Sequence, residues 1–203
     1  MAKIAPMDGA AVTPKVATSS YLEWGGIFGG SVIACAISVV LLQFGSSAGL
    51  ALGSPTLPNG GASWNVLVAG LWVVIVAIAS SAAGGYVAGR MRTRWDDNNE
   101  SESEFRDGIH GIAAWALATL GAAFFLAMIG AHGAAAVVNP ADAQLNESTV
   151  RLSAHITAIF SFATAAGSAL GAAAAWFAAI TGGEHRDEGT AFHHVVPVFL
   201  RKR

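Results

Sequence analysis

Four long segments of the chain contain no aspartate, glutamate, lysine or arginine, and this pattern limits the possible folds more than any other feature. They cover residues 24–64, which contain a Gly/Pro break near their end, and residues 65–89, 108–141 and 152–183. Each holds the roughly 20 apolar residues that an α-helix needs to cross about 30 Å of hydrocarbon. Only 12% of the residues are charged and 54% are hydrophobic, which is typical of integral membrane proteins. We therefore predict an all-α integral membrane protein with four transmembrane helices in two antiparallel hairpins.

The predicted domain organisation follows from the ends of these segments. We place the spans at about 24–52, 64–89, 108–138 and 152–180, within a transmembrane domain of residues 24–183. Residues 1–23 and 184–203 are then an N-terminal and a C-terminal tail. The first apolar run is longer than the 7–15 residues of a signal-peptide core, so we expect it to remain as a signal anchor.

The basic residues predict the orientation of the spans. If both tails and the loop between spans two and three share one side, that side holds ten of the eleven lysines and arginines, and only Arg151 lies opposite. The positive-inside rule then places both termini in the cytoplasm. We expect Arg90, Arg92, Arg94 and Arg106 to anchor the helix ends at the cytoplasmic headgroups.

Small residues recur at every fourth position in three of the spans. The stripes are Gly25/Gly29 and Gly26/Gly30 in the first span; Ala77, Ser81, Gly85 and Gly89 in the second; and Gly167, Gly171, Ala175 and Ala179 in the fourth. In lipid, such stripes allow two helix backbones to approach closely. We predict that they are helix-packing faces. The alternative is that glycine and alanine are simply common in membrane helices.

Few polar side chains lie within the spans. None of them is charged at mid-depth, which argues against a proton-coupled transporter. Gln43 is a candidate for an interhelical hydrogen bond or for a polar contact in a pore. His132 and His155 lie near the outer ends of spans three and four, so an antiparallel hairpin can bring them to similar depth for a metal or a haem. The competing interpretation is that each histidine bonds a backbone carbonyl or faces the polar interface.

The two charged regions outside the spans contain no recognised motif. We interpret residues 95–107, WDDNNESESEFRD, as a solvated linker with at most weak cation binding. His185, Asp187, Glu188, His193 and His194 do not have the spacing of a zinc motif, and we interpret them as part of a solvated tail. Because the common nucleotide, protease and redox signatures are also absent from the sequence, we predict no enzymatic activity and no cofactor.

Three stretches resemble small bacterial inner-membrane proteins of the PhnA-like group. These are WGGIFGGSVIACAISVVLLQFGSSAGL in span one, AAGGYVAGRMR at the end of span two and RDGIHGIAAWALATL opening span three. The resemblance implies a multi-span protein of the bacterial inner membrane and no established activity. Phosphonate chemistry, which the label suggests, is not carried over, because the chain has one cysteine and no catalytic constellation.

The leading hypothesis is a non-enzymatic membrane protein that acts by assembly, as a homo-oligomer or as an accessory subunit of a membrane complex. Its expected partners are membrane lipids and copies of itself or another membrane subunit, and not nucleic acid. The alternative is a channel or small-solute pore lined by Gln43 and by serines such as Ser46, Ser47, Ser80 and Ser81. A third hypothesis is haem or metal binding through His132 and His155.

Overall fold

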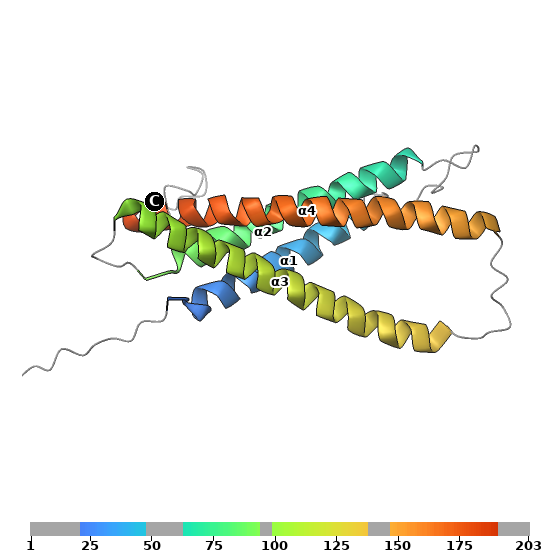
Figure 1. Ribbon diagram of the computed structural model, residues 1–203, viewed down its shortest axis with the longest axis horizontal. Helices are drawn as coiled ribbons and strands as arrows, with labels where there is room; N and C mark the ends of the chain where they lie inside the picture. The colour runs from blue at the N-terminus through green and yellow to red at the C-terminus, as the bar shows by residue number, and fades with distance from the viewer. Residues whose placement is uncertain (1–20, 48–62, 94–98, 138–146, 191–203) are drawn as a thin grey trace, which may run out of the picture.

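The computed structural model describes residues 21–47, 63–93, 99–137 and 147–190. This part of the chain forms four helices and no strand: α1 (Trp24–Ser47), α2 (Trp64–Arg90), α3 (Glu100–Val137) and α4 (Glu147–Asp187). All four are long and apolar enough to cross a membrane. The prediction of an all-α, multi-pass membrane protein with four spans is therefore confirmed (Figure 1).

α3 and α4 extend beyond the predicted spans. Their extensions enter the regions that we interpreted from the sequence as a solvated linker and a solvated tail. α3 begins at Glu100 because the Asn99 side chain accepts a hydrogen bond from the Glu102 N–H at 3.0 Å, as an N-cap does. The last residue of α4 is Asp187. Gly189, which has φ +63°, then terminates the helix. There the Thr190 N–H bonds the His185 carbonyl and the Gly189 N–H bonds that of Arg186, which is the Schellman arrangement. The charged residues of both regions are thus held on rigid helix ends.

The parallel helices α2 and α4 pack along their predicted small-residue stripes. The stripes face each other in four consecutive pairs: Ala77 with Gly167, Ser81 with Gly171, Gly85 with Ala175, and Gly89 with Ala179. A Cβ atom added at Gly85 or Gly89 would overlap a carbonyl oxygen of α4. The two backbones therefore touch, and only glycine fits at these two positions of α2.

The first helix packs antiparallel on α2 through one of its two predicted glycine pairs. Gly30 lies against the backbone of Gly84, and Gly26 lies against Ala88. Nearer the other end of α1, the Trp72 indole N–H donates to a backbone carbonyl of α1 at 3.0 Å. Among the described residues α1 contacts α2 and α3 but not α4, so it lies at the periphery of the bundle.

The other predicted pair in this helix, Gly25/Gly29, makes no close contact with another helix within the protomer. Gly25 is exposed and has no atom within 4 Å of an added Cβ. A Cβ at Gly29 would meet only the Met91 sulfur, at an ordinary van der Waals distance of 3.6 Å, and no backbone of another helix. The reason is helical periodicity: neighbouring residues point about 100° apart, so the Gly26/Gly30 pair that faces α2 turns Gly25 and Gly29 away from it.

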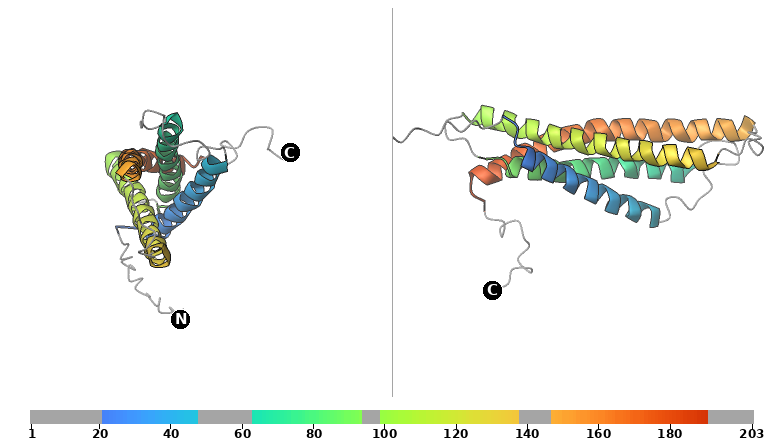
Figure 2. Two further views of the ribbon diagram at one scale, coloured as in Figure 1. Left: turned by 90° about the vertical axis from the view of Figure 1, so that its right-hand side faces the viewer. Right: turned by 90° about the horizontal axis from the view of Figure 1, so that it is seen from below.

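The helices converge at one end of the molecule and diverge toward the other. The converging end is formed by the start of α1, the end of α2, the start of α3 and the end of α4 (Figure 1). Figure 2 shows that the opposite ends of the four helices point in different directions. α3 packs on α4 near the converging end, where Gly108 lies against the Trp176 ring and Gly111 against Ala175. Close packing is therefore concentrated in the half of the bundle next to the charged residues.

We expect Gly85→Ala to lower the stability of the protein in detergent, because the added methyl group overlaps Ala175. Overpacking of this kind costs about 1–3 kcal/mol. Gly25→Ala is the matched control, since Gly25 also lies in a helix and has nothing within 4 Å of an added Cβ. Thermal unfolding of both variants measures the difference. Equal melting temperatures would contradict the close contact between α2 and α4.

Candidate functional site

At the converging end, charged side chains from three parts of the chain form one connected network. Asp107, in the second turn of α3, lies between Arg92, which follows α2, and Arg186 near the end of α4. Only 3% of the Asp107 side chain is exposed. We call Arg92, Ser103, Asp107, Arg186 and Asp187 the Asp107 cluster.

Arg186 connects the ends of three helices through its guanidinium group. Its Nη1 and Nη2 atoms donate to the two carboxylate oxygens of Asp107, at 2.9 and 3.1 Å. Its Nε and Nη2 atoms donate to Asp187, at 2.8 and 2.9 Å. Nη1 also donates to the Gly89 carbonyl, in the last turn of α2, at 2.8 Å. This double fork is the geometry in which arginine binds carboxylates most strongly.

Arg92 ties the segment after α2 to the first turns of α3. Its Nε donates to Asp107 and its Nη2 donates to Ser103 Oγ at 2.9 Å. The residue is only 4% exposed. The prediction that Arg92 anchors the helix at lipid headgroups is therefore wrong for this side chain. A buried carboxylate within reach attracts the guanidinium more strongly than exposed headgroups do, because water screens that attraction less.

A glycine pair on α4 makes room for the buried carboxylate. Any Cβ at Gly183 would overlap Asp107 Oδ2, and any Cβ at Gly182 would overlap the Tyr86 carbonyl on α2. These glycines follow directly after the last apolar turn of α4. They let α2 and α3 approach the end of α4 closely enough for Arg186 to reach both. The local sequence TGGEHRD thus combines the space and the charge that the cluster needs.

The cluster balances its charges internally. Two guanidinium groups face two carboxylates, and every carboxylate oxygen of Asp107 accepts from an arginine. A buried charge is tolerated when it is paired and hydrogen-bonded, whereas removing one partner leaves an uncompensated charge. With its groups mutually paired, the cluster is suited to fixing helix ends rather than to proton transfer or nucleophilic chemistry.

A cavity of about 300 Å³ lies beside the cluster, between the start of α3 and the end of α4. Its lining is strongly acidic: Glu100, Ser103, Glu104, Asp107, Ile180, Glu184, Asp187 and Glu188. Within the described residues, no three histidine, cysteine or carboxylate side chains are grouped to hold a metal ion. The acidic residues therefore surround the cluster without forming a metal centre in that part of the chain.

A second polar network joins the start of α1 to α3 and to the segment after α2. The Glu23 carboxylate accepts from the Thr93 N–H at 2.8 and 2.9 Å, and the Glu23 N–H donates to His110 Nε2 at 2.9 Å. Further along, Ser31 Oγ lies 3.0 Å from the Ala114 carbonyl of α3. All these bonds lie in the half of α1 nearest the converging end.

Two of the remaining predicted anchor residues, Arg90 and Arg106, also bond within the protein. Arg90 donates to the Tyr86 hydroxyl at 3.3 Å and to the Thr190 carbonyl at 2.7 Å. The Tyr86 hydroxyl also bonds His185 Nδ1 at 3.1 Å, so His185 belongs to the contact between α2 and α4. Arg106 pairs with Glu102 one turn earlier in α3. Arg94 lies outside the described residues.

The polar residues that the sequence singles out within the spans are not brought into one site. Gln43 is exposed on α1, and His155 is exposed on α4. The side chains of His132, Ser46 and Ser47 lie outside the described residues, and the helix segments that carry His132 and His155 diverge (Figure 1). The Ser80 hydroxyl donates to the Val76 carbonyl at 2.7 Å, so it satisfies its own helix. Pore lining and metal binding by these residues remain predictions.

The sequence contains a signal for the Asp107 cluster that the positive-inside count does not use. An Arg-Asp pair stands next to the apolar segment at the start of span three (Arg106-Asp107) and again after span four (Arg186-Asp187). With both ends on one side of the membrane, such pairs are within reach of each other. The prediction of orientation used only the arginines and placed the acidic residues in solvent. It therefore missed this pairing.

Comparisons with protein-family models, with curated proteins and with solved structures found no match to this chain. The resemblance to PhnA-like proteins therefore stays a prediction.

We expect Asp107→Asn to reduce the free energy of unfolding by about 3 kcal/mol, because two buried arginines lose their shared counter-charge. Glu102→Gln is the control: its pair with Arg106 is half exposed, and such pairs contribute less than about 1 kcal/mol. Titration of the protein with a denaturing detergent in mixed micelles measures both variants. Similar losses would mean that the Asp107 cluster does not hold the helix ends.

Proposed function

We propose that this is a non-enzymatic membrane protein that acts by assembly, and that it forms a homo-oligomer through α1 and α3. The observation that carries the proposal is the unequal use of the helix faces. The small-residue stripes of α2 and α4 are occupied by each other. We therefore assign the contact between protomers to the two other helices.

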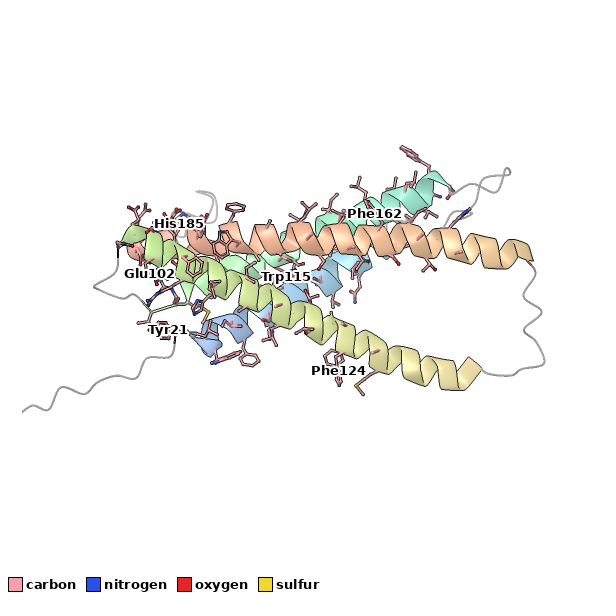
Figure 3. The ribbon with its side chains drawn as sticks, viewed as in Figure 1. Tyr21, Glu102, Trp115, Phe124, Phe162 and His185 are labelled. Atoms are coloured by element: carbon pink, nitrogen blue, oxygen red, sulfur yellow. The ribbon has the colours of Figure 1, made fainter. Side chains whose placement is uncertain are left out.

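The outer halves of α1 and α3 present large apolar side chains that the described chain leaves uncovered. On α1 these include Val39 and Val40, and on α3 they include Leu120, Phe124 and Phe125. Phe124 is 62% exposed and projects from α3 away from the bundle (Figure 3). Gly121, in the same turn of α3, has open space around its Cα atom. A glycine beside large apolar side chains favours close approach of another helix.

The contacts between α1 and α3 support a shared face. The two helices run side by side from Ser31 and Ala114 to Cys35 and Ala118, where the Cys35 thiol lies 4.0 Å from the Ala118 carbonyl. Beyond that point they diverge (Figure 2). A copy related by a two-fold axis normal to the membrane presents the same diverging pair, so the proposed contact is isologous.

The proposal includes an orientation. Arg90, Arg92, Arg106 and Arg186 all lie at the converging end. The positive-inside rule places that end at the cytoplasmic face. The diverging apolar ends of the helices then lie in the opposite leaflet, and assembly takes place there. The resemblance noted above makes the bacterial inner membrane the proposed location.

Disulfide cross-linking in native membranes tests the contact. In a Cys35→Ala background, we expect Phe124→Cys to give a covalent dimer on mild oxidation. Leu71→Cys is the matched control, because Leu71 is 60% exposed on α2 and lies outside the proposed face. Dimers from both variants, or from neither, would contradict the assignment of the face.

Native mass spectrometry of the protein extracted with its own lipids tests the assembly itself. A single homo-oligomer with only lipid attached is the expected spectrum. A strictly monomeric protein would overturn the proposal. An added mass from a different protein would mean that the chain is a subunit of a membrane complex and not a homo-oligomer.

A further inference from the structure

The side of α4 that packs on α3 continues outward as a row of hydroxyl groups. Its inner part is formed by Ala175 and Ala179, which lie against Gly111 of α3. Steps of three and four residues, which stay on one side of a helix, lead outward from Ala175 through Ala172 to four serines and threonines. We call these four residues the α4 hydroxyl row: Ser168, Thr164, Ser161 and Thr157.

The α4 hydroxyl row is uncovered over most of its length. Thr157, Ser161 and Thr164 are exposed, and among the described residues no hydrogen bond joins a hydroxyl of the row to another group. Other hydroxyls in the spans donate to the carbonyl four residues earlier, as those of Ser31, Ser38, Ser80 and Thr181 do. The row lies in a segment apolar enough to cross the membrane, where water does not supply the missing bonds. It therefore favours contact with another polar helix face.

The facing side of α3 continues outward in the same way. From Gly111, steps of three and four residues lead to Thr119 and Ala122. Thr119 is exposed, and within the described chain its hydroxyl makes no hydrogen bond. Because the two helices are antiparallel, Thr119 and Ser168 both lie about two turns outward from the contact between Gly111 and Ala175. The two helices therefore carry hydroxyl groups without partners at the same depth.

α3 and α4 are fixed to each other at one end only. At the converging end, Arg186 of α4 binds Asp107 of α3, and Gly111 lies against Ala175. The outer ends of the two helices diverge (Figures 1 and 2). Helices joined at one end can close on each other about that end, as in a hinge motion. The inner contact is therefore a suitable pivot for the outer half of α3.

From this geometry we propose that the outer half of α3, from Thr119 onward, closes onto the α4 hydroxyl row, while the Asp107 cluster holds the inner end. In the closed state the hydroxyls of Thr119 and Ser168 bond each other, and Ala122 packs beside Ala165. A hydroxyl both donates and accepts, so two of them can satisfy each other across a helix contact. In the open state, which the structure shows, the row is uncovered. This inference does not depend on the proposed assembly, because the motion takes place within one chain.

Disulfide formation within one chain, measured in native membranes, tests the closure. In a Cys35→Ala background, we expect Ala122→Cys/Ala165→Cys to form an intramolecular disulfide on mild oxidation. Both positions lie about three turns outward from the contact between Gly111 and Ala175, so closure brings them together. Both are exposed, and the substitutions leave every hydroxyl of the row in place. Loss of free thiols in a chain that still migrates as a monomer is the readout.

A second pair of cysteines is the matched control. Ala122→Cys/Leu170→Cys keeps the cysteine on α3 and moves the one on α4. Leu170 is 50% exposed and lies nearer to the converging end than Ala165 does. It follows Ser168 by two residues and is therefore about 200° around α4 from it. We expect this pair to keep both thiols free.

Removal of a hydroxyl tests whether the row stabilises the closed state. Thr119→Val, added to the Ala122→Cys/Ala165→Cys pair, deletes the hydroxyl and keeps a branched side chain. We expect the disulfide to form about threefold more slowly, the factor that corresponds to an average hydrogen bond between membrane helices. Thr181→Val is the control, because the Thr181 hydroxyl donates to the Phe177 carbonyl of its own helix and its loss should leave the rate unchanged.

Three outcomes would overturn the proposal. The first is the absence of an intramolecular disulfide, or equal disulfide formation in both cysteine pairs. The second is covalent dimers in place of the intramolecular disulfide, which would mean that a second copy covers the α4 hydroxyl row. The third is an unchanged rate after Thr119→Val, which would mean that the hydroxyls do not hold the closed state. Cross-linking through Phe124→Cys tests the proposed assembly separately, so either proposal can fail while the other stands.

Discussion

The carboxylate of Asp107, held between two arginines, is the interaction on which the arrangement of the helices depends. Hydrocarbon provides little drive for helices to associate, so their relative positions need contacts that are specific and strong. The guanidinium of Arg186 supplies them by binding the start of α3, the end of α2 and its own helix end. Because a charge without a partner is costly away from water, no member of the cluster can leave alone. The end of α2, the start of α3 and the end of α4 are therefore held together at this end.

The close packing of α2 on α4 continues what the charged residues begin. Gly182 and Gly183 bring α4 against α2 and α3 at the cluster, and the stripes that meet at Gly89 and Gly85 extend that approach into the membrane. Because these glycines have no side chain, the backbones of α2 and α4 reach van der Waals contact. The two kinds of interaction act at different depths. Charge pairs work at the polar boundary, and small residues work where no charge is tolerated.

Among the described residues, the opposite end of the molecule has no counterpart of the Asp107 cluster. There the Trp72 indole of α2 donates to a carbonyl of α1. α1 and α3 cross and then separate, and their apolar side chains face outward (Figures 1 and 2). In our proposal a second copy covers this surface. α1 does not contact α4 in the described chain. It is held by α2 through Gly26 and Gly30 and by α3 through Ser31.

The sequence alone determined the all-α class, the four membrane spans and the stripes of small residues. Long uncharged helices satisfy their backbone hydrogen bonds within hydrocarbon, so uncharged segments of sufficient length mark the spans. The small residues recur at every fourth position, so the stripes are visible in the sequence itself. It did not determine which stripes meet, or that Gly26/Gly30 packs while Gly25/Gly29 does not. Pairing of residues about 90 positions apart, such as Gly85 with Ala175, depends on how the hairpins fold over each other. The same holds for the candidate site: Arg92 and Arg186 were visible as basic residues, and His110 as one histidine among six. Only the tertiary structure placed these side chains around Asp107 and Glu23, since burial and partner decide whether a charged residue near a helix end faces solvent or another helix.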